Sequence, residues 1–289
     1  MTGKSDCAIC HHTNNASDQS TLQDQMKKME ALKNPLKAAL KSGRFQLGLW
    51  CSLGSSVVTE VLAGSGYDWL LIDAEHSPND MMSVLHQHQA AAGYPVEIVV
   101  RLPHHDNSLI KQYLDLGIRS LLIPNVQSVE EARAIVAATR YPPNGVRGFS
   151  ASQRANRYGR TKNYHGRASD EIFLALQIET AVAAREAKAI AEVDGVNAIF
   201  VGPGDLSADI GALGNPADAT VQETIHSVLA LASEGSIVTG ILTPSETDAR
   251  RYTEWGARMV AVGSDLGLLC SAADGLAARF SDIAAAKGR

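Results

Sequence analysis

The sequence predicts an α/β fold of the (β/α)8 TIM barrel class, in which eight parallel strands alternate with helices around one core. Three observations predict it. Short apolar runs alternate with amphipathic stretches along most of the chain. There are eight such runs, the number that closes this barrel. The chain has 289 residues, 45% of them hydrophobic, which suffices for one large core.

The expected strands are nearly unbroken apolar runs without polar alternation. This is the pattern of strands that are covered on both faces. They are residues 45–50, 69–73, 96–101, 119–123, 172–178, 197–201, 237–241 and 258–262.

The expected helices lie between these runs, for example at 128–139 and 180–192. A doubly wound open sheet is the alternative, but it would carry G-x-G-x-x-G after its first strand, and "LGLWCSLGSS" does not. Residues 20–43 are expected to form one or two extra helices before the barrel. Residues 141–170 are polar and rich in Arg, Gly and Tyr, and they are long for a loop that follows a strand.

Residues 21–289 are therefore expected to form a single catalytic domain, and the polar residues 1–20 a disordered tail. Cys7, Cys10 and His11 in this tail match the spacing of a c-type haem attachment site. Haem attachment requires export, and the sequence has no visible export signal. A disordered tail is the favoured interpretation.

Composition excludes several classes of partner. The formal net charge is -5, and the Lys and Arg residues are scattered, so we expect no nucleic-acid partner. No apolar run approaches the roughly 18 residues that a membrane span needs. With no signal peptide visible, a cytoplasmic location is expected.

Titratable residues gather where the expected strands end, which in a (β/α)8 barrel is where the active site lies. Asp73, Glu75 and His76 follow the second strand, and Arg101 ends the third. Asp73 and His76 are three residues apart, so the carboxylate could orient the imidazole as a proton-transfer pair. The alternatives are that Asp73 caps the helix beginning near Pro78 and that Arg101 forms an ordinary salt bridge.

Two further carboxylates follow the strands at 172–178 and 197–201. Glu179 and Asp205 are one strand–helix repeat apart, so both are expected on the same rim. Two such carboxylates without neighbouring cysteines favour a hard divalent ion such as Mg²⁺ or Mn²⁺. Spacing alone leaves open the alternative that each caps a helix. No lysine ends or lines an expected strand, which argues against Schiff-base chemistry.

Seven segments stand in this order along the chain: "GLWCSLGSS", "GYDWLLIDAEHSPND", "VRLP", "KQYLDLG", "RYPPNGVRG", "LQIET" and "FVGPGDLSADIG". Together they resemble the HpcH/HpaI aldolase family, and the similarity runs from about Asn34 to about Phe280. The resemblance implies a barrel of the phosphoenolpyruvate/pyruvate superfamily that acts as a metal-dependent class II aldolase. Such an enzyme reversibly cleaves a 4-hydroxy-2-oxo acid to pyruvate and an aldehyde, and is usually a hexamer, a trimer of dimers that exchange the last helix.

Carried over by motif, the resemblance assigns roles to the rim residues. Glu179 and Asp205 are implied to bind the metal, Mg²⁺, Mn²⁺ or Co²⁺. His76 is the implied acid/base, oriented by Asp73, and Arg101 the implied partner of the enolate oxygen. Glu75 is expected near metal-bound water.

The resemblance also implies residues that hold the substrate. Gln177 and Trp50 are expected in the substrate site, and the backbone N–H groups of Gly204 and Asp205 are expected to hold the pyruvate carboxylate. Asp115 of "YLDLG" is implied to lie near a neighbouring subunit's site. The sequence departs from relatives at four positions, which leaves the aldehyde half of the substrate open. They are His104, His105, Asn125 and Gly204.

Other functions stay open. Sugar-acid substrates such as 2-keto-3-deoxy-glucarate or -rhamnonate compete with 4-hydroxy-2-oxoheptanedioate. A CoA-ester lyase such as citramalyl-CoA lyase would need a basic nucleotide pocket, which the Arg-rich stretch 147–167 could supply. A phosphoenolpyruvate-using enzyme would need more cations than Arg101. A metabolite-binding barrel without turnover is the non-enzyme alternative.

Overall fold

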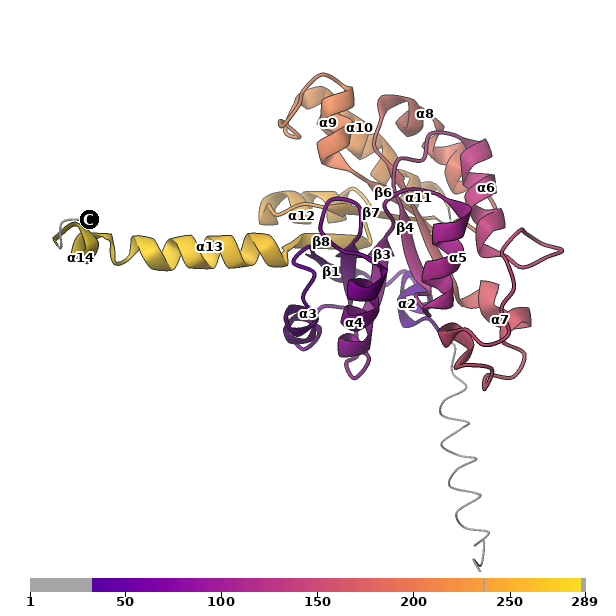
Figure 1. The fold of residues 1–289 in the computed structure, drawn as a ribbon. Helices are drawn as coiled ribbons and strands as arrows, with labels where there is room; N and C mark the ends of the chain where they lie inside the picture. The colour runs from indigo at the N-terminus through magenta and orange to yellow at the C-terminus, as the bar shows by residue number, and fades with distance from the viewer. Residues whose placement is uncertain (1–32, 236, 287–289) are drawn as a thin grey trace, which may run out of the picture. The chain divides into compact units, whose positions relative to one another are not determined.

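A closed barrel of eight parallel strands forms the centre of the chain (Figure 1). The computed structural model describes residues 33–235 and 237–286. Each strand pairs with the next in sequence, and β8 pairs with β1. Every predicted strand is confirmed to within two residues. The strands are β1 (Gln46–Cys51), β2 (Trp69–Asp73), β3 (Glu97–Arg101), β4 (Ser120–Ile123), β5 (Phe173–Ile178), β6 (Ala198–Val201), β7 (Val238–Leu242) and β8 (Met259–Ser264).

Helices connect successive strands, and most begin at a side chain that accepts a backbone N–H of the first turn. Ser55, Asp80, Ser128, Thr180 and Ser245 act in this way. The helices on the strand-to-strand connections are α3 (Ser56–Ala63), α4 (Met81–Ala91), α5 (Asn107–Asp115), α6 (Val129–Thr139), α7 (Tyr164–Glu171), α8 (Ala181–Ala191), α9 (Pro203–Asp209), α10 (Ala219–Leu229), α11 (Leu231–Glu234) and α12 (Glu246–Glu254).

Aromatic side chains fill the barrel interior. The ring centroids of Trp50 and Phe200 are 5.6 Å apart, and those of Trp69 and Phe200 are 6.4 Å apart. Gly48 makes room for this packing, since a Cβ there would lie 2.1 Å from Cε2 of Trp69. The interior is therefore a packed core, and chemistry is confined to the barrel ends.

The amino ends of the strands are covered by α2 (Pro35–Lys41). The predicted helix start at Asn34 and Pro35 is confirmed: Asn34 is the N-cap, and its side-chain amide donates to Ser120 Oγ over 2.8 Å. The predictions for residues 1–20, including the haem spacing at Cys7, Cys10 and His11, lie outside the described residues. In the described part of the chain, no helix has the length and apolarity to cross a membrane.

The polar stretch 141–170 differs from its predicted position. It joins α6 to β5 and contains only a short 3-10 helix (Arg154–Asn156) and α7. A connection from a helix to the next strand enters the barrel at the strands' amino ends. The stretch therefore lies opposite the rim where the site residues gather, and its interpretation as a loop that follows a strand is wrong.

The last long helix, α13 (Asp265–Ala278), leaves the barrel beside β8 (Figure 1). Asp265 is its one buried residue. The Asp265 carboxylate accepts the backbone N–H groups of Ser52 (2.8 Å) and Leu53 (3.1 Å), which ties the helix start to the loop after β1. A short helix, α14 (Ser281–Ala286), follows.

Candidate active site at the carboxyl ends of the strands

Arg101 and Asp73 form a buried pair at the ends of two neighbouring strands. The register of β2 and β3 sets Asp73 beside Arg101. Arg101 donates from Nε to Asp73 Oδ1 (2.9 Å) and from Nη2 to Oδ2 (2.7 Å). Burial alone would raise the pKa of Asp73, but the hydrogen bonds and charge of Arg101 outweigh it and lower that pKa. Asp73 is therefore an ionised anchor for the guanidinium.

The predicted contact between Asp73 and the His76 imidazole is wrong. Asp73 Oδ1 instead accepts the backbone N–H groups of Glu75 (3.0 Å) and His76 (3.3 Å). The imidazole Nε2 lies 3.9 Å from Glu75 Oε2, and the His76 side chain is 63% exposed. In this chain the carboxylate next to the imidazole is Glu75. The alternative of Asp73 as a helix cap is also not observed, because Asp80 caps α4.

Glu75 faces the same guanidinium as Asp73. Its Oε2 lies 3.0 Å from Arg101 Nη1. Burial raises the pKa of the Glu75 carboxyl, and the negative charges of Asp73 and Asp205 add to this rise. The positive charges of Arg101 and His76 oppose it. The ion pair with Arg101 was not predicted from the sequence.

Glu179 and Asp205 lie on the same rim, as predicted. Burial, together with the negative charges of Asp205 and Glu75, raises the pKa of Glu179 to about 7, although the hydrogen bond from Asn125 and the charge of Arg101 oppose the rise. β5 and β6 are paired in parallel, so Glu179, which follows β5, and Asp205, in the first turn of the helix after β6, lie at the same end of the barrel. Neither caps a helix through its side chain, since the N-caps of α8 and α9 are Thr180 and Gly202.

Asn125 holds Glu179 through its backbone, and sequence reasoning missed this role. Its N–H donates to Glu179 Oε2 over 2.7 Å. The residue has a left-handed backbone with φ of 53°, a conformation for which Asn is enriched among non-glycine residues. That preference is the one signal in the sequence that could have identified it.

Gln177 presents a buried acceptor at the same rim. The residue is 3% exposed, and its Oε1 has no hydrogen-bond partner. Gly202 packs against it closely, since a Cβ there would lie 2.9 Å from Gln177 Nε2 and 2.6 Å from Glu179 Oε1. An unpaired buried amide oxygen is costly unless a ligand or water satisfies it. Gln177 is therefore placed to contact a bound molecule.

Trp50 packs against Arg101, and Gly204 lies in a turn that faces open space. Trp50 is 4% exposed, and Arg101 Cζ lies 5.7 Å from its ring centroid, so the indole underlies the guanidinium. Gly204 and Asp205 lie in the first turn of α9, whose N-cap Gly202 has no side chain to accept their N–H groups. A Cβ at Gly204 would meet no atom within 4 Å, so this turn faces open space.

Asp115 does not join this group within one chain. It is the last residue of α5, at the end of the barrel opposite the rim. Its Oδ1 accepts from Arg147 Nη2 over 2.7 Å, and the Arg147 side chain is fully buried. An acid at a helix C-terminus opposes the helix dipole, and the arginine compensates for this.

The rim carries more acids than bases. Arg101 faces Asp73 and Glu75, and its pKa is raised by these acids and by Glu179 despite burial. Asp205 adds a further carboxylate. Among the described residues, no three His, Cys, Asp or Glu side chains converge on one metal position. The rim thus offers paired carboxylates with open positions around them.

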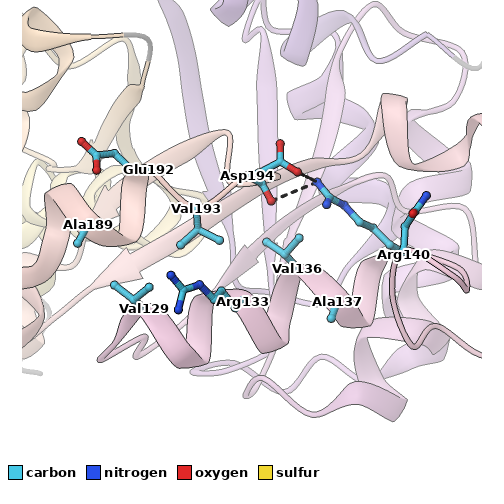
Figure 2. A pocket seen from close by; sticks show the side chains of 10 residues that line it. Val129, Arg133, Val136, Ala137, Arg140, Ala189, Glu192, Val193 and Asp194 are labelled. Carbon is cyan, nitrogen blue, oxygen red and sulfur yellow. Dashed lines mark hydrogen bonds and ion pairs between the residues drawn. The ribbon is translucent and has the colours of Figure 1, made fainter.

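A separate surface groove of about 600 Å³ lies between α6 and α8 (Figure 2). Val136 and Val193 line it, and Arg140 pairs with Asp194 at its edge (2.9 Å). None of the rim residues lines this groove.

Comparison with known proteins finds close relatives over almost the whole barrel. Residues 46–272 match the model of a family described as HpcH/HpaI aldolase/citrate lyase. A 4-hydroxy-2-oxo-heptane-1,7-dioate aldolase of Escherichia coli is 49% identical over 256 residues, covering 88% of this chain and 98% of that protein. One from Salmonella heidelberg is 50% identical over 250 residues, covering 86% and 95%. The crystal structure of an HpcH/HpaI aldolase/citrate lyase family protein from Burkholderia cenocepacia J2315 matches with a TM-score of 0.84 at 36% identity, covering 86% of this chain and 100% of that one.

Proposed function

We propose that this chain, which belongs to the HpcH/HpaI aldolase/citrate lyase family of carbon–carbon lyases, is a class II pyruvate aldolase. Its substrate is 4-hydroxy-2-oxo-heptane-1,7-dioate or a close homologue, by similarity to relatives of that name. The observation that carries the proposal is the grouping of Arg101, Gln177 and the carboxylates Glu179 and Asp205 on one rim.

The rim suits a divalent cation. Glu179 and Asp205 would hold it, because the raised pKa of Glu179 reflects burial and the repulsion that a cation would relieve. Two oxygen ligands leave positions for substrate and water, as Mg²⁺ and Mn²⁺ prefer. When bound, such an ion supplies Lewis-acid polarisation of the keto oxygen.

The chain's own residues account for the remaining steps. The N–H groups of Gly204 and Asp205 bind the substrate carboxylate, and Gln177 contacts the 2-oxo acid. His76 accepts the proton of the C4 hydroxyl as the C3–C4 bond breaks and the aldehyde leaves. The bonding electron pair becomes the enolate of pyruvate, and Arg101 donates hydrogen bonds to its oxygen. Protonation at C3 releases pyruvate.

A substrate panel tests this function. Pyruvate release should be fastest, by kcat/KM, with 4-hydroxy-2-oxo-heptane-1,7-dioate and slower with 2-keto-3-deoxy sugar acids. Turnover should require Mg²⁺ or Mn²⁺. Faster cleavage of a 2-keto-3-deoxy sugar acid would identify that acid as the substrate instead. Metal-independent turnover would contradict the mechanism.

The CoA-ester lyase alternative is less well supported. It relied on the Arg-rich stretch 147–167 to bind a nucleotide beside the site, and within one chain that stretch lies at the opposite end of the barrel, so only the stretch of a neighbouring subunit could serve. Of the side chains described on the rim, Arg101 is the one arginine, which also disfavours a phosphoenolpyruvate substrate.

Replacing His76 with Ala should slow carbon–carbon cleavage by about 10²–10⁴-fold, the usual effect of removing a positioned acid/base. Exchange of pyruvate methyl protons should fall much less, because enolate stabilisation is assigned to Arg101 and the metal. Both rates can be followed by NMR on the same sample. Unchanged cleavage would show that another group is the base.

The pH dependence of the free energy of unfolding should show the raised pKa of Glu179. In metal-free protein its pKa is raised to about 7, so the folded state holds this proton more tightly than the unfolded chain does. The free energy of unfolding should therefore fall as the pH rises from about 4.5 to about 7, by at most about 3 kcal/mol. Urea denaturation in EDTA at pH 5 and pH 8 measures this. Glu179→Gln should lack this contribution, and Mg²⁺ should stabilise the wild type most at pH 8.

The protein is proposed to be a homo-oligomer, a hexamer in which α13 packs on a neighbouring barrel. This helix exposes large apolar side chains that a monomer would leave in water. A groove lined by Phe45, Leu47 and Val260 lies between α12 and the paired strands β1 and β8. The large exposed apolar residues of the C-terminal helices and the turn between them are Leu266, Leu268, Leu269, Leu276, Phe280 and Ile283.

The double substitution Leu268→Glu, Leu269→Glu should dissociate the oligomer and reduce activity, because two charges cannot be buried unpaired in that groove. Light scattering after size-exclusion chromatography measures the assembly. Ser271→Glu, which adds a charge to the same helix without replacing one of its apolar side chains, is the control. An unchanged mass for the double variant would contradict the proposed packing of α13.

A further inference from the structure

The loop of residues 74–80 carries Glu75 and His76, and side chains rather than regular structure fix its shape. Its first half turns around the Asp73 carboxylate, which accepts the N–H groups of Glu75 and His76. Its second half returns to the Asp73 carbonyl oxygen, which accepts from Ser77 Oγ and from Asn79 Nδ2 (2.8 Å). Asn79 therefore closes the loop onto the end of β2.

The Asn79 side chain is held in one orientation. Its Nδ2 donates to the Asp73 carbonyl and to Ser77 Oγ (3.1 Å). Its Oδ1 accepts from Gln87 Nε2 (2.7 Å) and from Ser83 Oγ (3.1 Å). Because a carbonyl can only accept and Gln87 Nε2 can only donate, a flipped Asn79 amide would lose both contacts.

Gln87 is a fully buried amide on α4, whose other buried residues are Val84 and Ala91. Its Nε2 also donates to the Ser83 carbonyl (3.1 Å), and its Oε1 accepts from Thr59 Oγ1 (3.0 Å) on α3. Thr59 is fully buried as well. An apolar residue would fill this position without the cost of burying a polar group. What the glutamine adds is a fixed hydrogen bond to Asn79.

We propose that the chain of hydrogen bonds from Thr59 through Gln87 to Asn79 positions the catalytic loop. It sets Glu75 and His76 relative to Arg101 from α3 and α4, where Thr59 and Gln87 are fully buried. Asn79 and Gln87 are positioning residues, and the inference rests on the proposed aldolase function.

The neighbouring rim loop supports this role. Gly54, in the loop between β1 and α3, has a φ of +64°, and a Cβ there would lie 3.3 Å from Asn79 Oδ1. Asn79 thus lies where the loops after β1 and β2 meet. Movement of its side chain would change both loops at the site entrance.

Gln87→Met tests the proposal, because methionine nearly matches the volume of glutamine and removes only its hydrogen bonds. We expect kcat for cleavage to fall about 10- to 100-fold, the scale of misplacing a catalytic group. Exchange of pyruvate methyl protons, which needs Arg101 but not the loop, should change less than about twofold. Amide hydrogen exchange of residues 74–80 should become faster, while the thermal midpoint stays above the assay temperature.

Matched variants separate positioning from general packing. Gln89→Met, at an exposed position on the same helix, should behave as the wild type. Thr59→Ser keeps the hydroxyl donor and should retain activity, whereas Thr59→Val removes it and should reduce kcat. Wild-type kcat in Gln87→Met, or equal losses in cleavage and exchange, would overturn the inference. A wild-type protein with neither activity would contradict the proposed function instead, and hydrogen exchange of the loop would still test the positioning.

Discussion

Glu179→Gln should abolish metal-dependent cleavage while the barrel stays folded. Glutamine keeps an oxygen that can accept the Asn125 N–H, so the local hydrogen bond survives. It removes one of the two charged metal ligands proposed here. Loss of Lewis-acid stabilisation worth several kcal/mol corresponds to a rate decrease of about a thousandfold or more. Asp205→Asn should have the same effect.

Metal binding and activity should be measured together for these variants. Isothermal titration with Mn²⁺ should detect binding to the wild type and not to Glu179→Gln, and EDTA should inactivate the wild type reversibly. Glu186→Gln makes the same charge change on the exposed surface of α8 and should be neutral. Full activity of metal-free enzyme, or a borohydride-stable lysine adduct with pyruvate, would contradict the metal assignment.

The rim could be predicted from the sequence because parallel strands share a carboxyl end. Once the apolar runs were located, the residues after each run had to meet on one face of the barrel. Glu179, Asp205 and Arg101 were found in this way, although they are far apart in the chain. Their proposed roles could be assigned from residue type and position alone, without interatomic distances.

The partner of Asp73 could not be predicted in the same way. Its separation of three residues from His76 favoured that imidazole, but the register of β2 against β3 sets Asp73 beside Arg101. Strand register depends on packing across the whole barrel and is not visible in a short sequence window. The position of 141–170 was, in contrast, available from element order, because this stretch follows the helix at 128–139 and precedes the strand at 172–178.

Asn125 and Asn79 illustrate a second limit. Each holds a residue at a strand end by a hydrogen bond, Asn125 from a left-handed backbone N–H and Asn79 from a side-chain amide. Nothing in the local pattern of apolar and polar residues marks such contacts. They follow only from the backbone path of the loops after β4 and β2.

Mixing two inactive variants, Asp115→Asn and Glu179→Gln, should restore activity if neighbouring subunits share each site. Asp115 is proposed to act at a neighbour's rim, since it lies at the far end of its own barrel. Asparagine is preferred over alanine because the buried Arg147 depends on the Asp115 oxygen. Alanine would leave the buried Arg147 with neither the counter-charge nor the acceptor oxygen of Asp115, at a cost of about 3–5 kcal/mol. Asparagine loses the counter-charge but keeps the acceptor oxygen.

The recovered activity has an expected size. A site works when its own subunit carries intact Glu179 and its neighbour carries intact Asp115. In an equal, randomly exchanged mixture this holds for about a quarter of the sites. Each variant alone should stay inactive at the same total concentration, and native mass spectrometry with one isotope-labelled variant can verify subunit exchange. No recovery after verified exchange, or a fully active monomer, would refute the shared site, because Asp115 could then act only within its own chain.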